Sequence, residues 1–189
     1  MRYVTHPEVA VDPDVDVPRW GLDAIGRARA ERMVTRRWVR DIRRIISSDE
    51  TKAVQTADVL AAELGIAVER RAATGEIDRS AAGFLPPAEF EAVADACFAS
   101  PAASARGWER AVDAQRRIAE ALADLLADDG PGDIAVVGHG GVGTLWYCHL
   151  ARIPIERRWD QPGQGHVFTV DRATGRPLHH WRPIDDEGA

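Results

Sequence analysis

The chain contains few cysteines and lacks any long uninterrupted apolar run. Only two of its 189 residues are cysteine, Cys97 and Cys148, and their spacing does not suggest a disulfide framework. We therefore expect free, buried thiols in a reducing compartment. No apolar span has the length needed to cross a membrane, and no charged segment followed by an apolar one opens the chain. These features predict a cytoplasmic protein with no membrane partner.

The chain also lacks an excess of positive charge. The chain has 30 acidic against 24 basic residues, which gives a net charge of −6. This balance argues against nucleic acid or an anionic membrane as the main partner, although it leaves room for a local basic pocket. All the basic residues except Lys52 are arginine. A surface position is the ordinary expectation for a lysine, but one that is unique in the chain is of more interest than usual.

The pattern of apolar residues predicts the class of fold. With 45% apolar residues the chain can form one domain with a sizeable core. Short β-branched runs alternate with helical segments, and two closing strands are expected at 166–170 and 178–181. This alternation predicts an α/β protein: a three-layer α/β/α sandwich with a mostly parallel central sheet. We assign residues 1–189 to a single domain with a helical and loop insertion at about 74–106.

Five helices are expected from apolar spacing and from end signals. The first starts near Gly21, places Ile25 and Met33 on its apolar side, and carries a solvated face of arginines. The second has Ser48 as its N-cap and Gly65 as its stop signal. The remaining three are expected at 88–99, 107–128 and about 142–151.

Two histidines each follow a predicted strand. His6 stands where Pro7 ends the first strand, and His139 follows an apolar run and precedes Gly140 and Gly141, after which a helix is expected from about Val142. In open α/β sheets, ligands bind beyond the carboxyl ends of the strands, and a helix N-terminus favours an anion. Two histidines at two such turns indicate an anionic ligand between them, most simply a phosphate group.

Three segments, in the right order, resemble the histidine phosphatase superfamily, the phosphoglycerate-mutase-like group. Residues 47–57 (Ser-Ser-Asp-Glu-Thr-Lys-Ala-Val-Gln-Thr-Ala) are similar to the family stretch Ser-Ser-x-x-x-Arg-Ala-x-Gln-Thr-Ala. Residues 136–142 resemble the strand that ends in His-Gly-Gly, and residues 20–30 are similar to the family helix Leu-x-x-x-Gly-x-x-Gln-Ala, which lies between the first strand and the stretch at 47–57. The resemblance covers most of residues 1–152 and implies a phosphoglycerate-mutase-like fold.

The resemblance also implies roles for individual residues. His6 would be the nucleophile that takes the phosphoryl group, His139 would contact the phosphate, and Glu76 would donate a proton to the leaving alcohol. Gly140 lies in the glycine turn after His139, which would let the backbone come close to the phosphate. No metal or organic cofactor is implied.

The chain departs from the family at the Arg-His-Gly triplet. Thr5 stands in place of the arginine, Pro7 in place of the glycine, and Lys52 in place of a second arginine. A threonine carries no charge, and lysine lacks the planar fork of a guanidinium group. Arg79, three residues after Glu76, is the candidate to supply the missing charge. Losing one preorganised donor typically costs about 10² to 10³ in rate.

These residues predict a phosphomonoester hydrolase (phosphatase) that works through a phosphohistidine on His6 and is slow or narrow in specificity. Its partner would be a phosphorylated small molecule or another phosphate-containing ligand. The alternative is a catalytically inactive relative that binds a phosphorylated ligand or a protein. A mutase is disfavoured because the chain is short and its site has lost an arginine. The sequence leaves a homodimer open.

Overall fold

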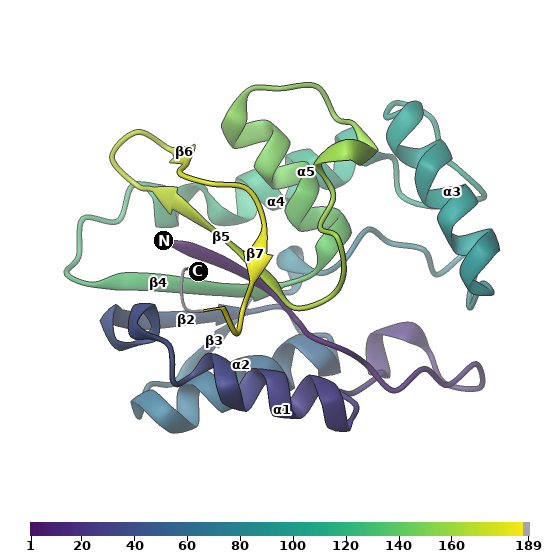
Figure 1. Cartoon of the computed structure of the whole chain (residues 1–189). Coiled ribbons are helices and arrows are strands. Elements are labelled where there is room, and N and C mark those ends of the chain that lie inside the picture. Colours follow the sequence, from purple (N-terminus) through teal and green to yellow (C-terminus); the bar gives the residue numbers. More distant parts are fainter. Residues whose placement is uncertain (187–189) are drawn as a thin grey trace.

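A mixed sheet lies at the centre of the computed structural model, which describes residues 1–186 (Figure 1). Its strand order is β3-β2-β4-β1-β5-β6, with β7 also paired to β5. The strands β1 to β4 pair in parallel, whereas β5 runs antiparallel to β1, β6 and β7. The strand bounds are β1 (Arg2–Thr5), β2 (Ile42–Ser47), β3 (Val68–Arg70), β4 (Asp133–Gly138), β5 (His166–Asp171), β6 (Arg176–Pro177) and β7 (Arg182–Pro183).

Helices cover both faces of the sheet. Figure 1 shows α1 and α2 on one face, α4 and α5 on the other, and α3 beyond the end of α5. This arrangement confirms the expected three-layer α/β/α sandwich. The α-helices are α1 (Ala24–Met33), α2 (Thr51–Leu64), α3 (Pro87–Ala99), α4 (Ala111–Leu126) and α5 (Gly140–Ala151). Short 3-10 helices lie at Val17–Arg19, Arg37–Asp41, Ala72–Thr74 and Arg157–Trp159.

The central strand β4 shows why the two layers of helices form. Successive side chains of a strand point to opposite faces, so an apolar run is buried on both sides. Ile134 and Val136 pack in the core beneath α4 and α5, whereas Ala135 and Val137 pack in the core above α2. The neighbouring strand β1 divides in the same way, with Tyr3 in the first core and Val4 in the second.

The sequence predicts the buried face of α1 only in part, because Met33 is buried as expected but Ile25 is not. Ile25 is 62% exposed, and the buried residues are Gly26, Ala30 and Met33. A Cβ atom at Gly26 would lie 2.1 Å from the carbonyl oxygen of Glu8. The helix therefore approaches the chain after β1 through its small residues, which the spacing of large apolar residues does not reveal.

Other expected boundaries also need correction. The helix expected at 142–151 begins two residues earlier, at Gly140, and the one expected at 107–128 begins at Ala111. The N-cap of α2 is Glu50 and not Ser48, and no side chain makes a capping bond there. The expected strand at 178–181 is wrong: residues 178–180 form a bend between β6 and β7. Both short strands end in proline, which cannot donate to a ladder.

Candidate active site

The parallel register of three adjacent strands brings the candidate residues to one edge of the sheet. Thr5 at the end of β1 lies opposite Gly138 at the end of β4, and Ser47 of β2 lies opposite Val137. The residues that follow these strands therefore meet. The ring centroids of His6 and His139 are 5.3 Å apart, with the rings nearly edge to face.

The imidazole of His6 is held in one tautomer. Its Nδ1 lies 2.9 Å from the carbonyl oxygen of Pro7, and because a carbonyl only accepts, Nδ1 carries the proton. Burial lowers the pKa of His6 to about 4, so the ring is neutral near pH 7. In the neutral ring Nε2 then has a free lone pair, which a nucleophilic nitrogen needs.

The backbone of His139 is fixed by Tyr3. The Tyr3 hydroxyl donates to the His139 carbonyl and accepts from its N–H, both at 3.2 Å. Cβ atoms at Gly138 and Gly143 would lie within 2.4 Å of the Tyr3 side chain, so only glycine at these positions leaves room for the ring. The His139 ring is fully buried, and its Nε2 lies 2.7 Å from the Ser48 hydroxyl. Burial lowers the pKa of His139 well below its usual value.

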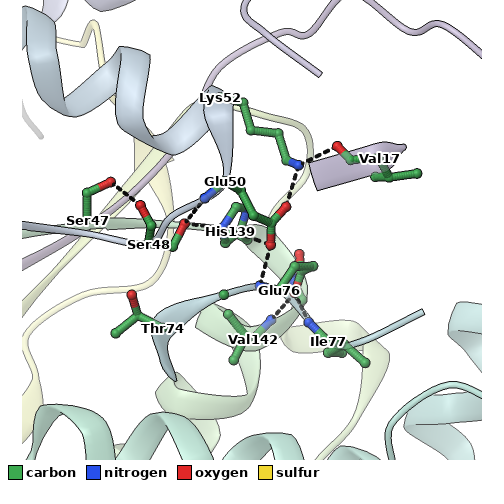
Figure 2. A network of polar contacts seen from close by, with 12 residues as sticks. Val17, Ser47, Ser48, Glu50, Lys52, Thr74, Glu76, Ile77, His139 and Val142 are labelled. Atoms are coloured by element: carbon green, nitrogen blue, oxygen red, sulfur yellow. Dashed lines mark hydrogen bonds and ion pairs between the residues drawn. The ribbon is translucent and has the colours of Figure 1, made fainter. Parts of the chain in front are cut away.

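Lys52 is buried and paired with a carboxylate (Figure 2). Its Nζ donates to Glu50 Oε2 at 2.5 Å and to the Val17 carbonyl at 3.0 Å. The other oxygen of Glu50, Oε1, accepts the Glu76 N–H at 2.8 Å and lies 3.4 Å from Nε2 of His139. Burial alone would raise the pKa of Glu50, but His139 and Lys52 lower it to about 2. Glu50 is therefore ionised at neutral pH.

A second carboxylate, that of Glu76, lies against the N-terminus of α5. Its oxygens accept the N–H groups of Val142 at 2.7 Å and Ile77 at 2.9 Å (Figure 2), and also that of Gly141 at 3.0 Å. Burial raises the pKa of Glu76, while the bonds from Ile77 and Val142 oppose that shift. The free N–H groups that make a helix start attractive to an anion are thus already partly used.

Thr5 and Gly140 are connected through a glutamine that the sequence did not single out. The Thr5 hydroxyl donates to Gln161 Oε1 at 2.7 Å and accepts the His166 N–H at 2.8 Å. A Cβ atom at Gly140 would lie 2.3 Å from Nε2 of Gln161, so the glutamine amide covers the start of α5. Its only sequence signal was a turn-rich connection, which gives no side-chain position.

Arg79 lies on the wall of the site. Its guanidinium packs over the rings of Phe90 and Trp108, 4.8 and 5.9 Å from their centroids. Together with Glu50 and Glu76 it lines a cavity of about 670 Å³, whose other walls are residues 13–19, 77–78, 80 and 83–84. The structure thus places Arg79 near the two carboxylates, with its charge directed partly onto aromatic faces.

The structure gathers most of the candidates and adds others. His6, His139, Lys52, Glu76, Thr5 and Gly140 meet at one strand edge. The sequence analysis gives no role in the site to Glu50, Tyr3 or Gln161. Within residues 1–186 no cluster of histidine, cysteine and acidic side chains has the makings of a metal site. In the same residues, no helix has both the length and the apolar character to span a membrane.

The fold and the paired histidines at the strand ends define a phosphoglycerate-mutase-like α/β protein. The model of the histidine phosphatase superfamily, branch 1, matches residues 9–181, and the chain belongs to this superfamily. The matched region starts three residues after His6. No curated protein matches the chain.

Solved structures share this fold at low sequence identity. Mycobacterial glucosyl-3-phosphoglycerate phosphatase with inorganic phosphate is 20% identical, with a TM-score of 0.78 over 98% of each chain. Bacillus stearothermophilus YhfR is 20% identical, with a TM-score of 0.74 over 98% of this chain and 96% of its own. Phosphoserine phosphatase from Entamoeba histolytica is 15% identical, with a TM-score of 0.75 over 96% of this chain and 95% of its own.

Proposed function

We propose that the protein hydrolyses phosphomonoesters through a phosphohistidine on His6. The observation that carries this proposal is the 2.9 Å contact between Nδ1 of His6 and the Pro7 carbonyl oxygen, which assigns the proton to Nδ1 and leaves Nε2 unprotonated. The low pKa of about 4 keeps Nε2 free over the neutral range. Membership of the histidine phosphatase superfamily supports the same chemistry.

The proposed reaction has two steps. Nε2 of His6 attacks the phosphorus atom, the bond to the ester oxygen breaks, and the leaving alkoxide takes a proton from the carboxyl group of Glu76. Burial raises the pKa of that group, which favours a form that carries a proton to give. A water molecule then attacks the phosphohistidine and returns a proton to Glu76, which releases inorganic phosphate and regenerates the free imidazole.

The remaining candidates would hold the phosphate oxygens. His139, Lys52 and Arg79 supply positive or hydrogen-bonding groups, and phosphoryl transfer depends mostly on positioning and on neutralising oxygen charge. Thr5 cannot supply the charge of the family arginine. Its bond to Gln161 instead holds an amide over Gly140, where a neutral donor can face the phosphate. The ligand would be a phosphorylated small molecule, and no metal is needed for this chemistry.

A second candidate function is binding without hydrolysis. The observation that favours it is the carboxylate of Glu50, which already pairs with Lys52 and leaves the site with little net positive charge. In that case the protein would bind a phosphorylated ligand or a protein partner.

The free cysteines Cys97 and Cys148 are compatible with the proposed cytoplasmic location, since both are buried and unpaired.

The test is phosphate release from a broad panel of phosphomonoesters by the parent, His6→Ala and His139→Ala. We expect release by the parent, at least about a 10³-fold loss in His6→Ala, because the nucleophile is gone, and about a 10²-fold loss in His139→Ala. Circular dichroism of each variant verifies the fold. Release that is equal in the parent and in both variants, or absent in all three, would exclude the hydrolase and leave the binding function.

A further inference from the structure

The groups that would hold an oxyanion beside the histidines already hold one. Lys52 Nζ and the backbone N–H of Glu76 donate to Glu50, and Nε2 of His139, whose hydrogen-bond partner is the Ser48 hydroxyl, lies 3.4 Å from Oε1 (Figure 2). Each carboxylate oxygen has its own partners: Oε2 accepts from the Lys52 ammonium group, and Oε1 accepts the Glu76 N–H and faces the His139 imidazole. We call these three groups the oxyanion cage. A carboxylate there occupies the place that two oxygens of a phosphate group would need.

The position of Glu50 depends on the backbone at the start of α2. Residues two apart on a helix do not face each other, so Glu50 and Lys52 would diverge if both were helical. Glu50 is instead the N-cap, with an extended backbone at φ −72° and ψ 134°. Its side chain can therefore reach from the helix start into the cage. Only 15% of the Glu50 side chain and 4% of the Lys52 side chain are exposed to solvent.

We propose that Glu50 is an internal ligand of the oxyanion cage and that a phosphate group enters the site by displacing it. The inference rests on the proposed use of this site for phosphoryl chemistry. Glu50 also forms part of the wall of the cavity of about 670 Å³, which gives its carboxylate a place to move. An ester whose alcohol part fills this cavity gains contacts that offset the displacement, whereas free phosphate gains none. The site would therefore select large phosphomonoesters and release the phosphate product as Glu50 returns.

The test is the affinity for inorganic phosphate at pH 7, measured by titration calorimetry on the parent and on Glu50→Gln. The amide keeps the shape and the acceptor for the Glu76 N–H but removes the negative charge. We expect Glu50→Gln to bind phosphate at least about tenfold more tightly, because like charges within about 4 Å repel strongly in a partly buried site. Asp49→Asn is the matched control, since it removes the same charge from the adjacent residue, which is exposed.

Three results would overturn the inference: no tightening in Glu50→Gln, equal tightening in Asp49→Asn, or a gain that persists in Glu50→Gln/Lys52→Met, which lacks the cage cation. If Glu50→Gln does not fold, Glu50→Ala provides the same test, because it also removes the negative charge and phosphate binding should still tighten. The same variants distinguish failure of this inference from failure of the proposed hydrolase activity. Tighter phosphate binding in Glu50→Gln without ester hydrolysis by any variant would retain the cage and exclude the enzyme, and hydrolysis without tightening would do the reverse.

Discussion

The two halves of the site are built in different ways. The histidine half consists of two neutral imidazoles that follow β1 and β4 and are fixed by backbone groups and by Tyr3. The carboxylate half consists of Glu50 and Glu76, which are bound by Lys52 and by backbone N–H groups around the start of α5. The first half leaves Nε2 of His6 unprotonated, as the proposed nucleophile requires, whereas the second half fills with protein oxygens the places where substrate oxygens would bind in the proposed reaction.

This difference separates two requirements of phosphoryl transfer. A nucleophile needs an unprotonated nitrogen in a fixed orientation, and the sheet supplies this through local geometry at the end of β1. Binding a dianion needs uncompensated positive charge, and here the lysine is compensated by its neighbour. The two halves can therefore be altered independently, and each of the following changes acts mainly on one of them.

The largest effect is expected from Lys52→Met, which breaks the carboxylate half. The substitution leaves Glu50 ionised, mostly buried and without its cation, and breaking such a pair typically costs about 3 kcal/mol or more. We expect a loss of about 3 kcal/mol in the free energy of unfolding, measured in urea at pH 7. The double variant Glu50→Gln/Lys52→Met removes both charges and should regain most of it. A single-variant loss below about 1 kcal/mol would show that the pair is not structurally coupled.

This dependence also shows what the sequence could and could not predict. The continuous apolar run of β4 and the glycines around His139 predict the sheet and the histidine half, because strand ends and helix starts are local features. The motif at residues 47–57 predicts the place of Lys52 on α2. The direction of the Glu50 side chain is not predictable in this way. It depends on the extended N-cap backbone and on the register of β2 against β4, which together bring it to His139.

Tyr3 illustrates the same limit of sequence-based prediction in the histidine half. Its β propensity predicts a strand, but its contact with His139 requires the glycines at 138 and 143, which lie more than 130 positions further along the chain. Ser48 likewise is a residue type that is common at helix N-caps, yet its hydroxyl forms a hydrogen bond with the imidazole of His139. Long-range packing determined both outcomes, and propensity carries no information about it.

The second-largest effect is expected in the pH dependence of stability, which differs between the histidine half and the carboxylate half. The folded pKa of His6 is about 4, below the usual 6.5, so the native state binds fewer protons than the unfolded state between these values. Stability is therefore complete above pH 6.5 and falls as the pH drops toward 4. Glu50, with a folded pKa of about 2, contributes stability that is lost only between about pH 4.5 and 2. The upper window thus reports on histidines and the lower one on carboxylates.

We expect His6 to account for a loss of about 2 kcal/mol between pH 6.5 and 5. Urea unfolding at intervals of half a pH unit measures the slope, and His6→Asn should reduce it in the upper window while leaving the lower window unchanged. His139 contributes to the same window, so part of the slope should remain. A His6→Asn slope identical to that of the parent would mean that His6 is not buried in its neutral form.

The smallest effect is expected from Arg79→Ala. This variant tests whether Arg79 provides the carboxylate half with a positive charge that can bind a ligand, since Lys52 is paired with Glu50. Its guanidinium packs on Phe90 and Trp108, and such contacts at partly exposed sites contribute about 0.5 to 1 kcal/mol. If Arg79 supplies the charge missing at Thr5, its removal should weaken phosphate binding about three- to tenfold, and Arg79→Lys, which keeps the charge, should retain most of the affinity. Calorimetric titration with phosphate measures both variants. Unchanged affinity in Arg79→Ala would restrict this residue to packing, because the loss of stacking lowers stability without altering the binding of an anion.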